Sequence, residues 1–244
     1  MRRSSSWRSR ERPASRARAA ETHGRPVPDP LASLTPAAGV FAIGGAAWGF
    51  LADRVAARWP VHEGGRVRAL DWRTIAVSLV GAWGYGALAV RWGEPRDLAV
   101  LSIYLAPLVL LLATDLDQRL LPDLLTLPLI PAALLVVLAG WDPLLAGKQL
   151  GVASGIGAAV VYPLLLRAGS ILFGGGLGQG DDKLLVSVGL MSGLLGFLQG
   201  MLAASLFVGA VLLLALATRR IGLRSYVPFG PIIVVAAIVA AIQP

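Results

Sequence analysis

Long apolar stretches alternate with short polar segments along most of the chain. They recur near residues 37–52, 74–90, 98–114, 124–140, 149–173, 184–195, 199–217 and 227–242. Several approach the roughly 17–20 residues that a helix needs to cross the hydrocarbon of a bilayer. The pattern therefore predicts an all-α, polytopic integral membrane protein with about eight transmembrane helices. The boundary between the sixth and seventh stretches rests on Gly196, Phe197 and Leu198 alone.

Composition supports a membrane environment. The chain is 56% hydrophobic and only 15% charged, with a mean hydropathy of +0.69, whereas a soluble domain of this length needs far more charged surface. The absence of cysteine excludes disulfides, thiolate metal sites and cysteine nucleophiles. The histidines, His23 and His62, lie outside the apolar stretches and do not form an HExxH pattern, which excludes a serine/histidine intramembrane protease and that type of zinc protease.

The amino-terminal segment differs from the rest of the chain. Residues 1–36 carry eight arginines among serine, alanine and proline, with too few apolar residues to offset the entropy cost of ordering. We predict a disordered basic tail over residues 1–36, followed by a membrane domain over residues 37–244.

The distribution of positive charge predicts the orientation. If all eight stretches span, the loops after the odd-numbered ones hold ten cationic residues and the opposite loops hold three, so the first set is expected to be cytoplasmic. The basic tail would then face outward. Either the true start lies downstream of Met1, or the tail stays inside and the first stretch does not span. The ten are Arg54, Arg58, Arg66, Arg68, Arg73, Arg119, Lys183, Arg219, Arg220 and Arg224, and the three are Arg91, Arg96 and Lys148.

Two aspartates stand at the cytoplasmic ends of apolar stretches. Asp115 follows the stretch 98–114, and Asp181 precedes the stretch that begins at residue 184. An ionisable group beside hydrocarbon is costly, and two such carboxylates can share a proton and activate water. The helix dipole disfavours negative charge at the carboxyl end of a helix and favours it at the amino end. We therefore expect Asp115 to hold the shared proton and Asp181 to act as the base.

The segments around these aspartates resemble signatures of the type IV prepilin peptidase family. Residues 115–129 resemble its D-x6-PDxLTLPL signature, including Pro122 and Asp123, and residues 178–185 resemble its GxGDxKL signature. A third similarity is Pro228-Phe229-Gly230-Pro231 at the start of the last apolar stretch. Within the second signature, Gly178, Gly180 and Lys183 match in addition to the aspartate. The two signatures in this order are far more specific than GxGD alone.

The resemblance implies an eight-helix GxGD-type aspartic endopeptidase of the inner or plasma membrane. Such an enzyme cuts the basic leader from type IV prepilin or pseudopilin substrates at the cytoplasmic face, with Asp115 and Asp181 as its catalytic residues. No cofactor or metal is expected for peptidase activity, and S-adenosylmethionine would be used only if methyl transfer is retained. The lipid bilayer is an expected partner, and no nucleic-acid partner is expected.

The chain also departs from the family. Classical members of the family carry two CxxC pairs in the first cytoplasmic loop, which are associated with a zinc-binding subdomain, and many also methylate the new amino terminus. Here the corresponding loop, predicted over Asp53–Asp71, is short and free of cysteine. Peptidase activity is therefore expected more than methyl transfer. Arg54, Arg58 and Trp59-Pro60 are interpreted as interfacial anchors and cytoplasmic charges.

Polar residues next to the two aspartates have simpler interpretations. Asp123 follows Pro122 and is expected to start or cap a helix. Asp117 is expected to be solvated. Asp182 adjoins Asp181 and could itself be the catalytic residue, but alignment to GxGD favours Asp181. Lys183 is expected to extend its charged end to the membrane interface.

Two other functions use the same residues. Intramembrane acids also mark transport pathways, so an ion- or proton-coupled carrier with Asp115 and Asp181 as a relay is one alternative. A noncatalytic scaffold of a pilus assembly machine is the other, and it would tolerate changes at both aspartates.

Overall fold

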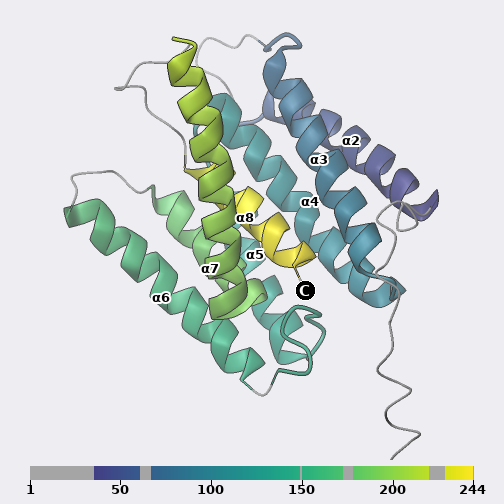
Figure 1. The fold of residues 1–244 in the computed structure, drawn as a ribbon, viewed down its shortest axis with the longest axis vertical. Helices are drawn as coiled ribbons and strands as arrows, with labels where there is room; N and C mark the ends of the chain where they lie inside the picture. The colour runs from purple at the N-terminus through teal and green to yellow at the C-terminus, as the bar shows by residue number, and fades with distance from the viewer. Residues whose placement is uncertain (1–35, 61–66, 149, 173–177, 220–228, 244) are drawn as a thin grey trace, which may run out of the picture. The chain divides into compact units, whose positions relative to one another are not determined.

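The computed structural model describes residues 36–60, 67–148, 150–172, 178–219 and 229–243, all within the compact unit Thr35–Pro244. These residues form seven α-helices and no strand (Figure 1). The predicted disordered tail of residues 1–36 lies outside this part of the chain except for Pro36, the first residue of the first helix.

The helices follow the predicted apolar stretches closely. Four of the described helices, α3, α4, α6 and α7, are long and apolar enough to cross a membrane, and α5 and α8 are shorter apolar helices. The regular structure of the described residues is thus entirely helical, with the apolar helices typical of a polytopic membrane protein. The helix bounds are α2 Pro36–Ala56, α3 Trp72–Arg91, α4 Pro95–Gln118, α5 Asp123–Leu138, α6 Gly151–Leu172, α7 Gln179–Ala217 and α8 Gly230–Ile242.

The boundary predicted within residues 184–217 is wrong in position. Residues 196–198 are helical, and α7 instead bends at Gly193, whose φ of +66° suits a residue without a Cβ. At the bend, side chains of α6 form hydrogen bonds with both the N–H and the carbonyl group of Leu194. The Leu194 N–H donates to Ser154 Oγ over 2.9 Å, and Tyr162 donates to the Leu194 carbonyl over 2.6 Å. Such compensation permits a broken helix in an apolar environment.

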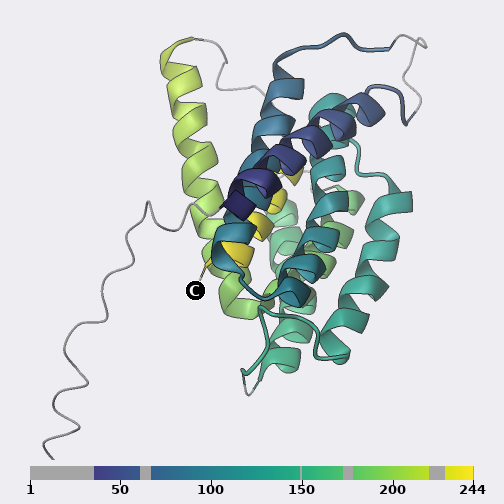
Figure 2. The same cartoon turned by 90° about the vertical axis from the view of Figure 1, so that its right-hand side faces the viewer.

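The helices pack in two groups, which are joined by the contact between α4 and α8. Helix α2 packs most extensively on α3, and both contact α4 (Figure 2). Helix α6 packs on α7, which also contacts α5 and α8, while α4 contacts α8.

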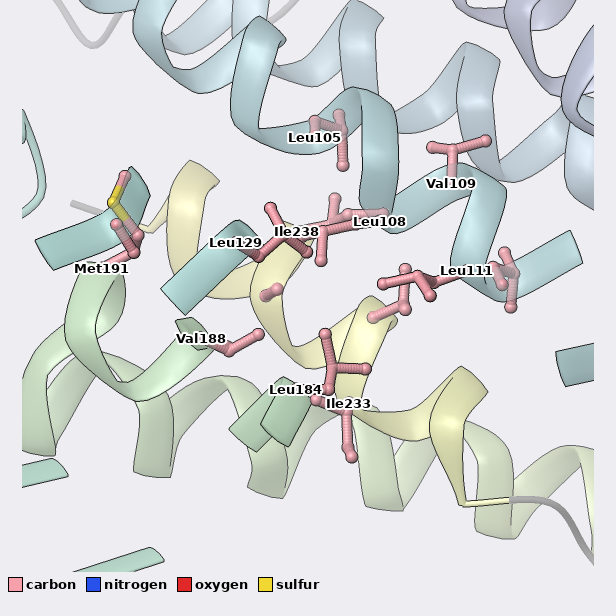
Figure 3. Close-up of a cluster of buried hydrophobic side chains, with 14 of the residues drawn as sticks. Leu105, Leu108, Val109, Leu111, Leu129, Leu184, Val188, Met191, Ile233 and Ile238 are labelled. Carbon is pink, nitrogen blue, oxygen red and sulfur yellow. The ribbon is translucent and has the colours of Figure 1, made fainter. Parts of the chain in front are cut away.

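Buried aliphatic side chains from α4, α5, α7 and α8 meet in one core (Figure 3). Leu111, Leu184 and Ile233, from α4, α7 and α8, are fully buried there. Leu111 lies one turn before Asp115, and Leu184 lies one turn after Asp181. The core therefore fixes the helix ends that carry both aspartates.

The loop predicted to begin at Asp53 begins later. Helix α2 continues to Ala56, and Asp53 lies fully buried in its last turn. An ionised carboxylate is rarely buried unless it is paired. Asp53 is paired with Arg54 and Arg68 and accepts a hydrogen bond from Thr74 over 2.7 Å. The charged residue that suggested the start of a loop therefore has its partners inside the fold.

Candidate active site

Asp115 lies in the last turn of α4, as its place after an apolar stretch predicts. The helix ends because Arg119 takes a left-handed conformation, with φ of +56°, while its N–H donates to the Asp115 carbonyl over 2.9 Å. The Asp115 residue is 5% exposed, and its Oδ2 atom is buried without a hydrogen-bond partner among the described residues. A buried oxygen without a partner is costly, and water or a substrate group would satisfy it.

Asp181 lies in the first turn of α7, which also agrees with the sequence. Its Oδ2 accepts a hydrogen bond of 3.2 Å from the backbone N–H of Gly178, the residue that precedes the helix. The amino end of a helix favours a carboxylate. The charge of Asp181 acts on Asp115, so the two acids are electrostatic neighbours although 66 positions separate them.

Two contacts hold the segments around these acids together. Gly180 packs so closely on Leu121 that a Cβ at position 180 would lie 2.7 Å from the Leu121 Cβ. One turn further, Lys183 Nζ lies 2.5 Å from Asp123 Oδ1. The signatures that are separate in the sequence are therefore one site in the fold.

The third similar segment completes this site. Gly230, the first residue of α8, packs against Asp115, and a Cβ there would lie 2.7 Å from Asp115 Oδ2. Pro228 of the same segment lies outside the described residues. The first residue of α8 thus lies against the unpartnered oxygen of Asp115.

Polar neighbours of the two aspartates have structural partners. Asp182 forms an ion pair with Arg167 of α6. Asp123 starts α5 as expected, but Pro122 occupies the cap position and no side chain caps this helix. Lys183, which we expected to reach the interface, is held by Asp123 and is 27% exposed.

The prediction that Asp117 is solvated is wrong. Its side chain is 2% exposed and lies between two arginines, 2.7 Å from Arg68 Nε and 2.8 Å from a terminal nitrogen of Arg73. Both arginines belong to the segment around the start of α3, so no local pattern near Asp117 could have revealed the pairing.

The interpretation of the first loop changes in part. Arg54 is not a simple interfacial charge, because it pairs with Asp53 and donates to Thr74 over 3.1 Å. Arg58 is exposed, as expected of a cytoplasmic charge. The Pro60 carbonyl accepts a hydrogen bond of 2.8 Å from the Gln118 side chain at the end of α4.

The site therefore contains two acids in different surroundings at neighbouring helix ends. One carboxylate sits at a helix amino end, and the other sits at a helix carboxyl end with a buried free oxygen. Such a pair can divide the roles of proton donor and base. The described residues contain no group of three or more histidine, cysteine, aspartate or glutamate side chains that could hold a metal ion.

Comparison with known proteins agrees with these motifs. The sequence profile of the type IV leader peptidase family matches residues 102–214, which include both aspartates. The prepilin leader peptidase/N-methyltransferase of Aeromonas hydrophila is 34% identical over 193 residues, covering 76% of this chain and 58% of that protein. The protein of the same name from Bacillus subtilis is 31% identical over 173 residues, covering 68% of this chain and 64% of that protein. No solved structure gives a significant match.

The chain spans about three fifths of the length of these curated relatives. The profile match nevertheless contains both aspartates together with the contacts that join their segments, Gly180 with Leu121 and Lys183 with Asp123. The resemblance seen in the sequence is confirmed, and the chain belongs to the type IV leader peptidase family.

Proposed function

We propose that the protein is a membrane aspartic endopeptidase that cuts the basic leader from type IV prepilin or pseudopilin substrates, with Asp115 and Asp181 as its catalytic pair. The observation that carries this proposal is the juxtaposition of two acids at helix ends, one of which, Asp115, is buried with an unpartnered oxygen. Family membership supplies the class of substrate.

The surroundings of the two acids suggest their roles. Asp181 accepts a backbone hydrogen bond at a helix amino end, which stabilises a carboxylate. Asp115 is buried at the carboxyl end of α4, and both its burial and that dipole favour a neutral carboxyl group, although the amino end of α8 packs against the same side chain. In the proposed reaction Asp181 takes a proton from water as the water attacks the scissile carbonyl, and Asp115 donates its proton to the carbonyl oxygen. The carbon–nitrogen bond then breaks as Asp181 gives its proton to the leaving nitrogen, and Asp115 takes back a proton from the hydroxyl group that becomes the new carboxyl group.

The two acids supply both the base and the acid, so the proposed reaction needs no metal or cofactor, and cleavage is expected to survive strong chelation. The substrate would present a basic segment followed by an apolar helix. That helix would lie in the bilayer and bring the scissile bond to the cytoplasmic face, and the balance of cationic residues supports a location of both aspartates at this face.

One observation gives the carrier alternative a concrete form. Tyr104 of α4 is partly buried with its hydroxyl group inside the fold beside Ser187 of α7, and the charge of Asp142, in the connection between α5 and α6, acts on Tyr104. A proton relay through the membrane would need polar groups of this kind between two acids. A carrier would therefore lose function in Tyr104→Phe, whereas a peptidase would keep its cleavage activity.

The proposal is tested by co-expressing each variant with a prepilin and measuring leader removal by the shift in its mass. Asp115→Asn and Asp181→Asn are each expected to reduce cleavage to the level seen without the enzyme, at normal abundance in the membrane. Substantial cleavage by either variant would remove that residue from the catalytic pair, and a wild-type protein that cleaves no prepilin would refute the function.

A further inference from the structure

We propose that Arg68 is a positioning residue for catalysis: it ties the last turn of α4 to α2 and to the start of α3, and thereby fixes the place of Asp115. This inference rests on the proposed peptidase function. Arg68 itself lies outside the family-matched segment 102–214, which it precedes by 34 positions.

The Arg68 guanidinium joins three carboxylates from different parts of the fold. It forms ion pairs with Asp53 in the last turn of α2 and with Asp71 at the cap of α3. Its Nε atom lies 2.7 Å from Asp117 Oδ1 in the last turn of α4, an ion pair without hydrogen-bond geometry. The planar guanidinium donates in fixed directions to Asp53 and Asp71, and its charge attracts Asp117, so a single arginine can set the relative positions of three helix ends.

Burial makes these ion pairs significant. The Arg68 side chain is 14% exposed, and the side chains of Asp53 and Asp117 are 0% and 2% exposed. Exposed ion pairs contribute little because water and salt screen them. When one partner of a buried pair is removed, the other is left as an uncompensated charge, so the remaining groups must move or admit water.

A second set of contacts acts on the same turn of α4. Arg73 donates to Asp117 over 2.8 Å, and the Gln118 side chain donates to the Pro60 carbonyl over 2.8 Å. Two consecutive residues at the end of α4 are thus tied to the segments on either side of the connection between α2 and α3.

These ties matter because of where Asp115 lies. The last turn of a helix frays more readily than its middle. Residues two positions apart on a helix do not share a face, so Asp117 is held on one side while Asp115 points elsewhere, against Gly230 of α8. Fixing Asp117 therefore fixes the rotation of the turn and the distance at which Asp115 meets Asp181.

The first test compares two matched substitutions. Arg68→Lys keeps the charge but loses the fork of donors, and Arg58→Lys makes the same change at an exposed arginine nearby. With purified enzyme and a prepilin, Arg68→Lys is expected to lower kcat by about tenfold to 100-fold with little change in KM, because a displaced catalytic group affects the chemical step. Arg58→Lys is expected to retain wild-type kinetics.

The second test restores the tie without the charges. The double variant Arg68→Cys with Asp117→Cys removes the ion pair between these two residues and introduces the only two thiols in the chain. It is expected to show a similar loss of kcat, and treatment with a short bifunctional thiol reagent is expected to recover much of it. A monofunctional reagent of similar size is the control, and it should recover nothing.

The outcomes separate this inference from the function on which it rests. Normal kcat in Arg68→Lys, or no recovery in the double variant once mass spectrometry shows the cross-link, would refute the positioning role while the wild-type protein still cleaves. A wild-type protein without cleavage activity would instead refute the proposed function. If Arg68→Lys does not accumulate in the membrane, the double variant decides alone.

Discussion

Lys183 of α7 and Asp123 of α5 form an ion pair of 2.5 Å that joins the two segments carrying the catalytic candidates. Lys183 lies two residues after Asp181, and Asp123 lies at the start of the helix that follows Asp115. Neither member of the pair is itself a catalytic candidate. Its contribution is therefore one of assembly, and its exposure determines how large that contribution is.

We expect Asp123→Asn to retain most of its cleavage activity. The Asp123 side chain is 62% exposed, and exposed ion pairs contribute about 0–1 kcal/mol to stability. Initial rates on a co-expressed prepilin, normalised to enzyme abundance, provide the measurement. Asp182→Asn is the companion variant. Asp182 forms an ion pair with Arg167 rather than with the catalytic candidates, so this variant should also retain most of its cleavage activity. Loss of activity in Asp182→Asn with retention in Asp181→Asn would move the catalytic position by one residue.

Close backbone approach at two glycines should be more critical than this ion pair. In Gly180→Ala the new Cβ would meet the Leu121 Cβ at 2.7 Å, and in Gly230→Ala it would meet Asp115 Oδ2 at 2.7 Å. Each clash has to separate the elements that hold the two acids, so we expect activity to fall by about tenfold to 100-fold.

The control for the glycine variants is Gly93→Ala, because no atom lies within 4 Å of a Cβ built at position 93. Rates for all three proteins are compared at equal abundance in the membrane. Wild-type rates in Gly230→Ala would show that the start of α8 can move away from Asp115 without loss of activity. Close packing of Gly230 on Asp115 would then not be required for cleavage.

Much of the site could be predicted from the sequence because its acids mark helix ends. Asp115 and Asp181 stand where apolar stretches stop and start, and the end of such a stretch is visible without knowledge of tertiary contacts. The burial of Asp117 could not be predicted in this way, since Arg68 and Arg73 come from a distant segment. The bend at Gly193 likewise depends on Ser154 and Tyr162 of another helix.

Asp142 should make the stability of the protein depend on pH. It lies between α5 and α6, where burial raises its pKa to about 7 despite hydrogen bonds from the backbone of Leu144 and Leu145 and the charge of Lys148. Because the folded pKa exceeds the unfolded value of 3.8, stability is greatest below pH 4 with respect to this group and falls as the pH rises to about 7. The loss is on the order of 4 kcal/mol.

Asn at position 142 cannot ionise and can still accept the hydrogen bond from Leu144. We therefore expect the apparent Tm of wild-type protein in detergent to fall more between pH 5 and about pH 8 than that of Asp142→Asn. The comparison of the two proteins removes the contribution of all other titrating groups. Parallel Tm curves for the two proteins would show that Asp142 ionises without cost in the folded state.

Orientation can be tested with single cysteines, because the chain has none of its own. Val67 is 57% exposed between α2 and α3, Gly93 is exposed between α3 and α4, and Ala146 is exposed between α5 and α6. The distribution of cationic residues predicts that a membrane-impermeant thiol reagent added to intact cells labels positions 93 and 146 but not 67. Labelling at position 67 alone would place both aspartates outside the cell and refute the proposed reaction, since its substrate leader is cytoplasmic.

The last prediction concerns methyl transfer, which is part of the names of the curated relatives. The chain spans about three fifths of their length, and helices α2 and α3 are joined here by only residues 57–71. In that connection Arg68 and Asp71 are already engaged in ion pairs. A methyl donor such as S-adenosylmethionine needs a pocket of its own, and so short a segment leaves few residues to build one. We therefore expect the cleaved product to carry an unmodified amino terminus.

Mass spectrometry of the mature product decides this question after co-expression of a prepilin with the wild-type protein and with Asp181→Asn. Cleaved product without added mass is expected from the wild-type protein, and uncleaved prepilin is expected from the variant. One added methyl group at the new amino terminus, dependent on this protein, would contradict the prediction. It would mean that a methyltransferase surface exists on this chain despite the short connection between α2 and α3.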